Sequence, residues 1–248
     1  MYKSIDLFAG IGGIRLGFDK AFRENIETVF VSELDEKAKE TYRANFKDKF
    51  DINGDITKIK EIEIPEHDIL LAGFPCQAFS LAGLKKGFED ARGTLFFDVA
   101  RIAEYHKPKV VFCENVKNLV NHDRGKTFKV IIRILENLGY KVYEKVLNSK
   151  NFGVPQNRER IYIVAFREDI DSSDFSFPEK TDNNKVISDI MEEKEVSPKY
   201  YLSNVYLDSL MRHKQRHESK GNGFGYEIKK LNGIANTLVC GGMGRERN

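Results

Sequence analysis

The sequence predicts an α/β protein built on a doubly wound, mostly parallel sheet. Along residues 3–167, short apolar segments with strand character alternate with segments whose apolar residues recur at helical spacing. Several of the apolar segments end in a glycine or a polar side chain, and the connections between segments are short. This alternation is typical of an open parallel sheet with helices on both faces, whose ligands bind at the carboxyl ends of the strands.

The first predicted strand covers residues 3–8 and runs into a glycine-rich turn at residues 10–13. Apolar residues then recur at helical spacing as far as about Arg23, so a helix follows the turn. Because glycine has no side chain, the backbone of such a turn can approach a ligand closely. A glycine turn alone is weak evidence, since many such turns only join two elements tightly.

The second predicted strand, residues 28–31, ends close to Glu33, about twenty residues after the glycines. An acidic side chain at this place is suited to accept hydrogen bonds from two ribose hydroxyls. A helix over residues 35–46 follows, and residues 54–56 are expected to close a third strand–helix unit. Within that unit Asp55 could accept a bond from an adenine amino group or could cap a helix, and the residue alone favours the cap.

The next apolar run, residues 68–72, predicts a buried strand that stops just before Pro75 and Cys76. The proline fixes φ and turns the chain outward, so the cysteine is held in one place and stays accessible. A loop with glycines and lysines separates it from a helix over residues 94–106. A lone cysteine is more often buried and inert, but this arrangement suggests a nucleophile with a lid.

A further buried strand, residues 109–113, runs into Glu114 and holds Cys113, which is interpreted as a core residue. One helix and two more strands are expected at residues 127–138, 141–147 and 160–166. In the segment before the last strand, Arg158 and Arg160 are predicted to alternate onto the same face. Because parallel strands end at one edge of the sheet, the glycine turn, Glu33, Asp55, Cys76 and Glu114 are expected to share one cleft.

Composition narrows the class of protein. The 248 residues are 41% hydrophobic and 31% charged, and no apolar run approaches the length of about 18 residues that a membrane span needs. Three widely spaced cysteines fit a reducing cytoplasm and argue against a disulfide framework or a metal site. The net charge is +2, but residues 201–248 hold eight Lys/Arg and four Asp/Glu, a modest indication of phosphate binding.

The alternating pattern ends near residue 167. A charged stretch follows to about residue 199, and residues 200–248 are rich in glycine and lysine. We therefore expect a ligand-binding catalytic domain at residues 1–167 and a second region at 168–248.

Five motifs occur in order along the chain. They are Asp6-x-Phe8-x-Gly10-x-Gly12-Gly13, Gly73-Phe74-Pro75-Cys76-Gln77-x-Phe79-Ser80, Arg92-Gly93-Thr94-Leu95-Phe96-Phe97, Glu114-Asn115-Val116 and Gln156-x-Arg158-x-Arg160. Together they resemble the C5-cytosine DNA methyltransferases of bacterial restriction–modification systems, densely over residues 3–167. The resemblance implies a Rossmann-like fold that binds S-adenosylmethionine and releases S-adenosylhomocysteine. By the same resemblance, residues 168–248 are part of a target-recognition region.

The resemblance also assigns roles to residues. Those implied to line the cofactor site are Phe8, Gly10, Gly12, Glu33, Asp55, Pro75 and Leu95. Cys76 is implied to add as thiolate to cytosine C6, with a protonated Glu114 near N3, Arg160 at O2, and Arg158 holding a loop or phosphate. The methyl group then moves to C5, a base removes H5 and the cysteine leaves. A stacked base is out of reach, so the cytosine must be flipped out of the duplex.

The implied partner is duplex DNA, and the implied location is the bacterial cytoplasm. Residues implied to contact DNA are Gln77, Ser80, Lys85, Lys86, Thr237 and Leu238. The last two resemble a Thr-Leu pair of the family's recognition region. The family's following segment and its final helix find no match, so we expect a second polypeptide to supply them, unless the sequence is a truncated piece.

Three other functions are weighed against this one. A dehydrogenase would use the glycine turn and Glu33 but has no use for the Pro-Cys-Gln loop or the two arginines. The transfer-RNA cytosine methyltransferases share the catalytic motifs, but their Cys-Phe-Thr signature is absent from this sequence. A non-catalytic DNA-binding subunit would not need Cys76, Glu114 and Arg160.

Overall fold

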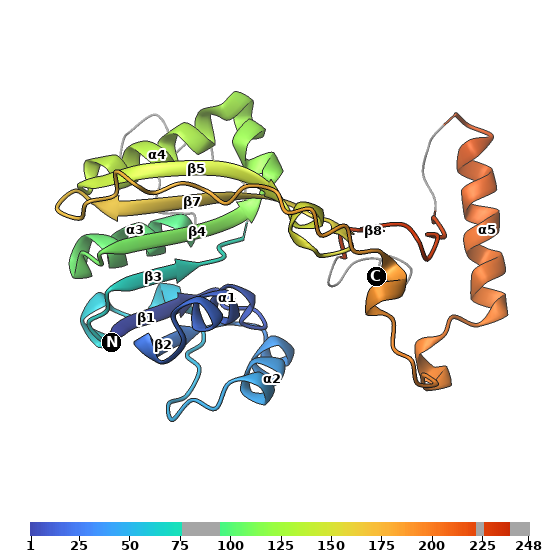
Figure 1. The fold of residues 1–248 in the computed structure, drawn as a ribbon, viewed down its shortest axis with the longest axis horizontal. Helices are drawn as coiled ribbons and strands as arrows, with labels where there is room; N and C mark the ends of the chain where they lie inside the picture. Colours follow the sequence, from blue (N-terminus) through green and yellow to red (C-terminus); the bar gives the residue numbers. More distant parts are fainter. Residues whose placement is uncertain (76–94, 222–225, 239–248) are drawn as a thin grey trace. The chain divides into compact units, whose positions relative to one another are not determined.

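The computed structural model describes residues 1–75, 95–221 and 226–238, which form two compact units (Figure 1). The first unit comprises Met1–Leu147 and Arg160–Phe177, and the second comprises Asn148–Glu159 and Pro178–Asn248. The first unit therefore extends past residue 167, and a short excursion before its last strand belongs to the second unit. The functional division at residue 167 stays a prediction.

The first unit is organised around a six-stranded sheet with the order β2-β1-β3-β4-β7-β5 (Figure 1). Its strands are β1 (Tyr2–Leu7), β2 (Ile26–Ser32), β3 (Ile69–Ala72), β4 (Val110–Val116), β5 (Tyr140–Asn148) and β7 (Glu159–Arg167). Strands β1 to β4 pair in parallel, whereas β7 is antiparallel to β4. The predicted mostly parallel sheet is confirmed.

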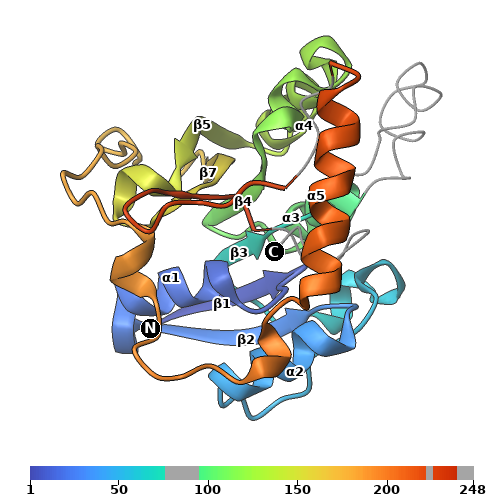
Figure 2. The same cartoon turned by 90° about the vertical axis from the view of Figure 1, so that its right-hand side faces the viewer.

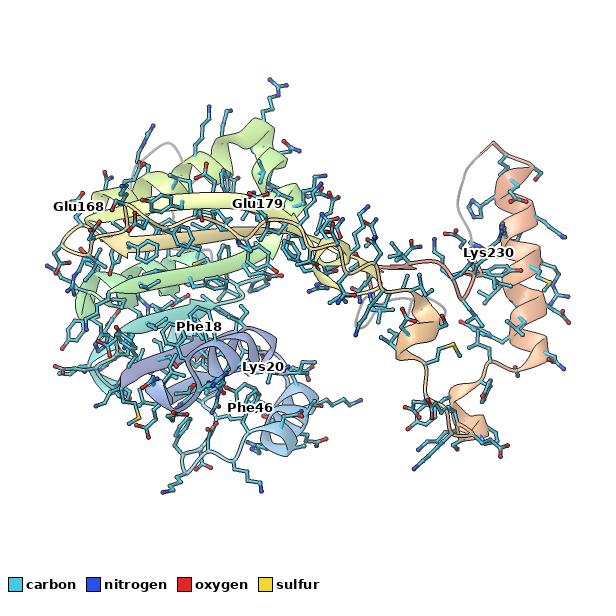
Figure 3. The ribbon with its side chains drawn as sticks, viewed as in Figure 1. Phe18, Lys20, Phe46, Glu168, Glu179 and Lys230 are labelled. Carbon is cyan, nitrogen blue, oxygen red and sulfur yellow. The ribbon has the colours of Figure 1, made fainter. Side chains whose placement is uncertain are left out.

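Helices cover both faces of this sheet. They are α1 (Gly13–Phe22), α2 (Glu36–Asn45), α3 (Leu95–His106) and α4 (Lys126–Asn137). Because side chains alternate along a strand, Ile69 and Leu71 of β3 pack with α1, while Leu70 and Ala72 belong to the core that includes α3 and α4. Figure 2 shows α1 and α4 on different sides of the strands. Phe18 of α1, labelled in Figure 3, packs edge-on against Phe112 at 5.1 Å between ring centroids. The doubly wound arrangement is confirmed.

The prediction of a third strand–helix unit at residues 54–56 is wrong. Only an isolated parallel bridge between Ser32 and Asn53 forms there, and a 3-10 helix, η2 (Ile56–Lys58), follows. The Asn53 N–H donates to the Val31 carbonyl, and the Glu33 N–H donates to the Asn53 carbonyl. Asp55 then caps η2 and turns the chain away, so the pairing cannot extend into a strand.

The second unit contains a two-stranded parallel ladder, β6 (Gln156–Asn157) with β8 (Ala235–Asn236), and a helix, α5 (Asn204–Glu218). The Ser203 hydroxyl caps α5 by accepting from the Tyr206 N–H. The sequence did not predict α5, because none of its residues is buried and its pattern lacks a strong apolar stripe. Among the helices that the structure describes, none is long and apolar enough to cross a membrane.

Candidate functional site

A pocket of about 330 Å³ opens at the carboxyl ends of β1, β2 and β3 in the first unit. It is lined by Phe8, Ser32, Glu33, Leu34, Gly54, Asp55, Ile56, Gly73, Pro75 and Leu95. These include five of the seven residues predicted to bind the cofactor. The two others, Gly10 and Gly12, belong to the glycine turn but do not line the pocket.

Glu33 joins the glycine turn to the end of β2. Its Oε2 accepts a hydrogen bond of 2.7 Å from the Gly10 N–H, and its Oε1 accepts bonds of 2.8 Å from the N–H groups of Leu34 and Asp35. A carboxylate offers about four acceptor positions, so it can still accept hydrogen bonds from a ligand. The carboxylate is thus oriented by backbone donors before any ligand arrives.

The glycine turn is shaped by left-handed backbone. Gly10 and Gly12 have φ of 55° and 85°, and Phe8 adopts φ of 55° although it is not a glycine. A Cβ on Gly12 would lie 2.2 Å from the ring of Phe46, which is labelled in Figure 3. Gly12 is therefore required for packing against the segment after α2, whatever its role toward a ligand.

Asp55 combines the two roles that the sequence left open. Its Oδ1 accepts from the Thr57 hydroxyl at 2.7 Å and from the Thr57 N–H at 3.1 Å, which makes it a cap. The hydrogen bond from the Thr57 hydroxyl, and to a lesser extent the one from the Thr57 N–H, hold the pKa of Asp55 below its usual value. The same side chain lines the pocket, and Oδ2 has Lys58 Nζ at 3.5 Å. An ionised acceptor therefore borders the pocket.

A buried polar network near the glycine turn was not foreseen from the sequence. Arg15 donates to both oxygens of Asp48, at 2.5 and 2.7 Å, and to the Tyr42 hydroxyl at 2.9 Å. That hydroxyl donates at 3.4 Å to Oδ2 of Asp6, which is 1% exposed. Asp6 Oδ1 has no hydrogen-bond partner among the described residues. Burial raises the pKa of Asp6 to about 7, although Arg15 and Tyr42 oppose the shift.

Replacing Asp6 with asparagine should flatten the pH dependence of stability. Folded Asp6 keeps its proton up to about pH 7, whereas the unfolded carboxyl loses it near 3.8, so stability falls as pH rises between these values. The shift corresponds to a loss on the order of 4 kcal/mol from this group. Urea unfolding of wild type and Asp6→Asn at pH 4.5, 6 and 8 measures the difference. Parallel pH profiles for the two proteins would contradict the assignment.

Glu114 and Arg160 form an ion pair where β4 meets β7. Arg160 Nε lies 3.0 Å from Glu114 Oε1, and the two side chains are 13% and 19% exposed. The antiparallel register places Arg160 opposite Val116 and Glu114 opposite Tyr162. Taking two charges out of water costs free energy, so a partly buried pair of this kind is weak evidence for a role in stability. The structure brings together these two predicted catalytic residues.

Arg158 lies outside the strand that holds Arg160, as the predicted strand from residue 160 onward implied, and the shared face of the two arginines stays a prediction. Arg158 lies between β6 and β7, outside both strands, and its backbone N–H donates to the Gln156 carbonyl at 3.0 Å. Arg158 belongs to the second unit, whereas Arg160 belongs to the first. The two-residue strand β6 before Arg158 pairs with β8 and not with the main sheet.

Asn115 has a positional role that the sequence reasoning missed, although its motif was noted. The side chain is buried, and its Nδ2 donates to the Phe74 carbonyl at 2.8 Å. Its Oδ1 accepts from the Val116 N–H at 2.8 Å. Asn115 therefore ties the end of β4 to the residues just before Cys76. The sequence feature that could have indicated this role is the amide side chain of Asn115, which stands between Glu114 and the apolar Val116.

The remaining predicted residues divide into two groups. Cys76, Gln77, Ser80, Lys85 and Lys86 lie outside the described residues. In the second unit, the Thr237 hydroxyl donates to the Asn157 carbonyl at 2.7 Å, and Leu238 is 55% exposed.

Cys113 is fully buried in the core, as predicted. Burial raises the pKa of its thiol to about 12, so it is inert as a nucleophile near neutral pH. In the parts of the chain that the structure describes, no group of His, Cys, Asp or Glu is arranged to hold a metal ion.

A larger hollow of about 580 Å³ lies at the amino ends of the parallel strands, lined in part by Lys3, His67, Asp68, Lys109 and Arg167. Two of its cations already have acidic partners: Lys109 pairs with Asp68 at 2.9 Å and Arg167 with Asp169 at 2.6 Å. Ligands of doubly wound sheets bind at the opposite edge. The smaller pocket beside the glycine turn is therefore the candidate site.

Comparison with known proteins identifies the family of the chain. The model of the C-5 cytosine-specific DNA methylase family matches residues 2–245. The chain is 58% identical over 251 residues to the Type II methyltransferase M.HpaII of Haemophilus parainfluenzae, covering 98% of this chain and 68% of that protein. It is 52% identical over 229 residues to M.SsoII of Shigella sonnei, covering 92% of this chain and 59% of that protein.

Solved structures show the same fold at low sequence identity. The DNMT2 of Spodoptera frugiperda aligns with a TM-score of 0.72 at 21% identity, over 95% of this chain and 69% of that chain. The Dnmt2 methyltransferase of S. pombe aligns with a TM-score of 0.69 at 19% identity, with the same coverage. These likenesses establish the architecture.

Proposed function

The chain belongs to the C-5 cytosine-specific DNA methylase family, and on that premise we propose that it carries the machinery to methylate C5 of cytosine in a specific duplex DNA sequence. The methyl donor in this proposal is S-adenosylmethionine, which leaves as S-adenosylhomocysteine. The observation that carries the proposal is the pocket at the strand ends, where Phe8, Glu33 and Asp55 lie together.

The residues of this pocket fit an adenosine group. Its volume of about 330 Å³ falls in the range of ligand pockets, and Phe8, Pro75 and Leu95 give it apolar walls. The prearranged carboxylate of Glu33 keeps acceptor capacity for a ribose hydroxyl, and the ionised Asp55 suits an amino group at the base edge. When bound, S-adenosylmethionine supplies an electrophilic methyl group on its sulfonium.

The nucleophile in this proposal is Cys76, which lies two residues after Phe74 in the sequence. Its thiolate adds to C6 of the cytosine, and the electron pair moves into the ring, so C5 becomes nucleophilic. The C5–methyl bond then forms, a base removes H5, and the electrons that return expel the thiolate. The anchor that Asn115 provides at the Phe74 carbonyl supports accurate placement of the cysteine.

Glu114 and Arg160 stabilise the ring as charge develops. As an ion pair, Glu114 is ionised, yet donation to cytosine N3 requires a proton on its carboxyl. We therefore infer that the arriving base changes this pair: Arg160 turns to the O2 edge while Glu114 acquires a proton to share with N3. The base must leave the duplex stack to reach these groups, which makes flipping part of the proposal.

The alternatives receive less support. The relatives at 50% identity or more are named Type II methyltransferases, and the likeness to Dnmt2 structures stays near 20% identity. A transfer-RNA substrate is therefore not favoured. A purely binding subunit would not need the partly buried pair of Glu114 and Arg160 for catalysis.

Methyl transfer is tested directly with a radioactive methyl donor. This chain, together with the product of an adjacent reading frame, is incubated with methyl-labelled S-adenosylmethionine and duplex DNA of mixed sequence, and the DNA is digested to nucleosides. We expect label in 5-methylcytosine, whereas a parallel incubation with transfer RNA should stay unlabelled. Label in adenine, or in transfer RNA alone, would contradict the proposed function.

The expected second polypeptide stays a prediction of its own. The chain spans 68% of the length of M.HpaII and 59% of M.SsoII, so the proposal concerns the machinery that these residues carry. The labelled assay is therefore run with this chain alone and with the product of an adjacent reading frame. Full turnover by this chain alone would contradict the need for a second polypeptide.

A further inference from the structure

Arg101 of α3 binds three separate acceptors with one guanidinium. Its Nε donates to Asp98 Oδ1 at 2.9 Å, and its Nη1 donates to Glu61 Oε1 at 2.7 Å. Its Nη2 donates to the Ile56 carbonyl at 2.7 Å. Asp98 lies one turn earlier on the same helix, so the guanidinium is fixed by its own helix and holds the segment of residues 56–61 against it.

This segment begins at the cofactor pocket. Ile56 follows Asp55 directly, and both residues line the pocket. Leu95, the first residue of α3, lines the same pocket. A second bond, between His106 Nε2 and the Glu61 carbonyl at 2.9 Å, holds the far end of the segment to α3. Arg101 therefore helps to fix the position of Asp55 relative to α3, although Arg101 itself does not line the pocket.

The charges make this link specific for arginine. Asp98 and Glu61 are 13% and 30% exposed, and each is held beside the guanidinium. Without it, two carboxylates would remain close together, and the Ile56 carbonyl would lose its donor. A lysine is a single point charge and cannot reach three acceptors in the fixed fork of a guanidinium.

We propose that Arg101 is a positioning residue for recognition of the cofactor's adenine, because it fixes the carboxylate of Asp55 at the edge of the pocket. The inference rests on the proposed function, since it assumes that Asp55 accepts from the adenine amino group. Asp55 Oδ1 already accepts hydrogen bonds from Thr57, so the orientation of its remaining lone pairs depends on the position of the backbone at residues 55 and 56. Arg101 fixes this backbone position through its hydrogen bond to the Ile56 carbonyl.

The test compares two ligands that differ at the base edge that carries the amino group. S-adenosylhomocysteine has the amino group, whereas S-inosylhomocysteine carries a carbonyl oxygen there, which an ionised carboxylate repels, and a proton on the neighbouring N1. Calorimetry uses a preparation that passes the methyl-transfer assay, and we expect wild type to prefer the amino ligand by about tenfold or more. Arg101→Gln should lower the affinity for S-adenosylhomocysteine by about tenfold and bring the ratio of the two affinities close to one. The affinity ratio of Arg101→Lys should lie between those of wild type and Arg101→Gln.

Exposed Arg133 of α4 provides the matched control, and Arg133→Gln should keep both affinities. A merely structural role of Arg101 would weaken both ligands equally, so an unchanged preference in folded Arg101→Gln and Arg101→Lys would overturn the inference. If Arg101→Gln does not fold, the preference of Arg101→Lys decides. If wild type methylates DNA but does not prefer the amino ligand, only the inference about Arg101 is overturned. If wild type does not transfer the methyl group at all, the proposed function is overturned.

Discussion

Replacing Cys76 with serine should abolish methyl transfer to DNA, with a loss of several orders of magnitude. A serine hydroxyl is far less ionised than a thiol near neutral pH and is a poorer nucleophile toward C6. Binding of S-adenosylhomocysteine should persist, because in this proposal Glu33 and Asp55 hold the cofactor. The labelled methyl assay and calorimetry measure the two effects separately.

Cys113→Ala is the matched control for this change. Cys113 is buried in β4, and its raised thiol pKa of about 12 excludes it as a nucleophile near neutral pH. The variant should keep methyl transfer within a few-fold of wild type, after correction for its folded fraction. Activity retained in Cys76→Ser but lost in folded Cys113→Ala would contradict the assignment of the nucleophile.

Replacing Glu33 with alanine should lower affinity for S-adenosylhomocysteine by about ten- to a hundredfold. Hydrogen bonds to a charged group contribute about 1.5–3 kcal/mol, and 1.4 kcal/mol corresponds to a factor of ten. The structure adds a second reason, because the carboxylate also accepts from the Gly10, Leu34 and Asp35 N–H groups. Calorimetry on wild type and Glu33→Ala gives the difference directly.

Two further variants separate ligand binding from general effects. Glu40 is an exposed carboxylate on the nearby helix α2, and Glu40→Ala should bind S-adenosylhomocysteine as wild type does. Glu33→Gln keeps one acceptor oxygen and should lose less affinity than Glu33→Ala. Equal affinity of wild type and Glu33→Ala would remove Glu33 from the cofactor site.

The sequence allowed much of the first unit to be predicted, because periodicity and strand ends are local signals. Apolar runs located the strands, and the rule that parallel strands end at one edge placed the glycine turn, Glu33, Asp55, Cys76 and Glu114 in one cleft. Glu33 and Asp55 do line one pocket, whereas Gly10, Gly12 and Glu114 do not line it. Cys113 could be assigned to the core because it lies within an apolar run.

The features that were missed depend on partners far away in the chain. Asn115 acts through the Phe74 carbonyl, 41 residues earlier, and Arg101 through the Ile56 carbonyl, 45 residues earlier. The strand β6, just before Arg158, pairs with β8, which lies about eighty residues later in the sequence, a distance over which local patterns carry no information. Helix α5 buries no residue, so hydrophobic periodicity could not reveal it.

Covalent trapping tests the central claim, that this chain forms a bond from Cys76 to a flipped cytosine. Duplex DNA with 5-fluorocytosine at the target position is incubated with the active protein and S-adenosylmethionine, because fluorine at C5 cannot be removed as a proton after methyl transfer. Peptide mass spectrometry should find a methylated fluorocytosine attached to Cys76, and no adduct in Cys76→Ala. An adduct that persists in Cys76→Ala, or one mapped to another residue, would contradict the account.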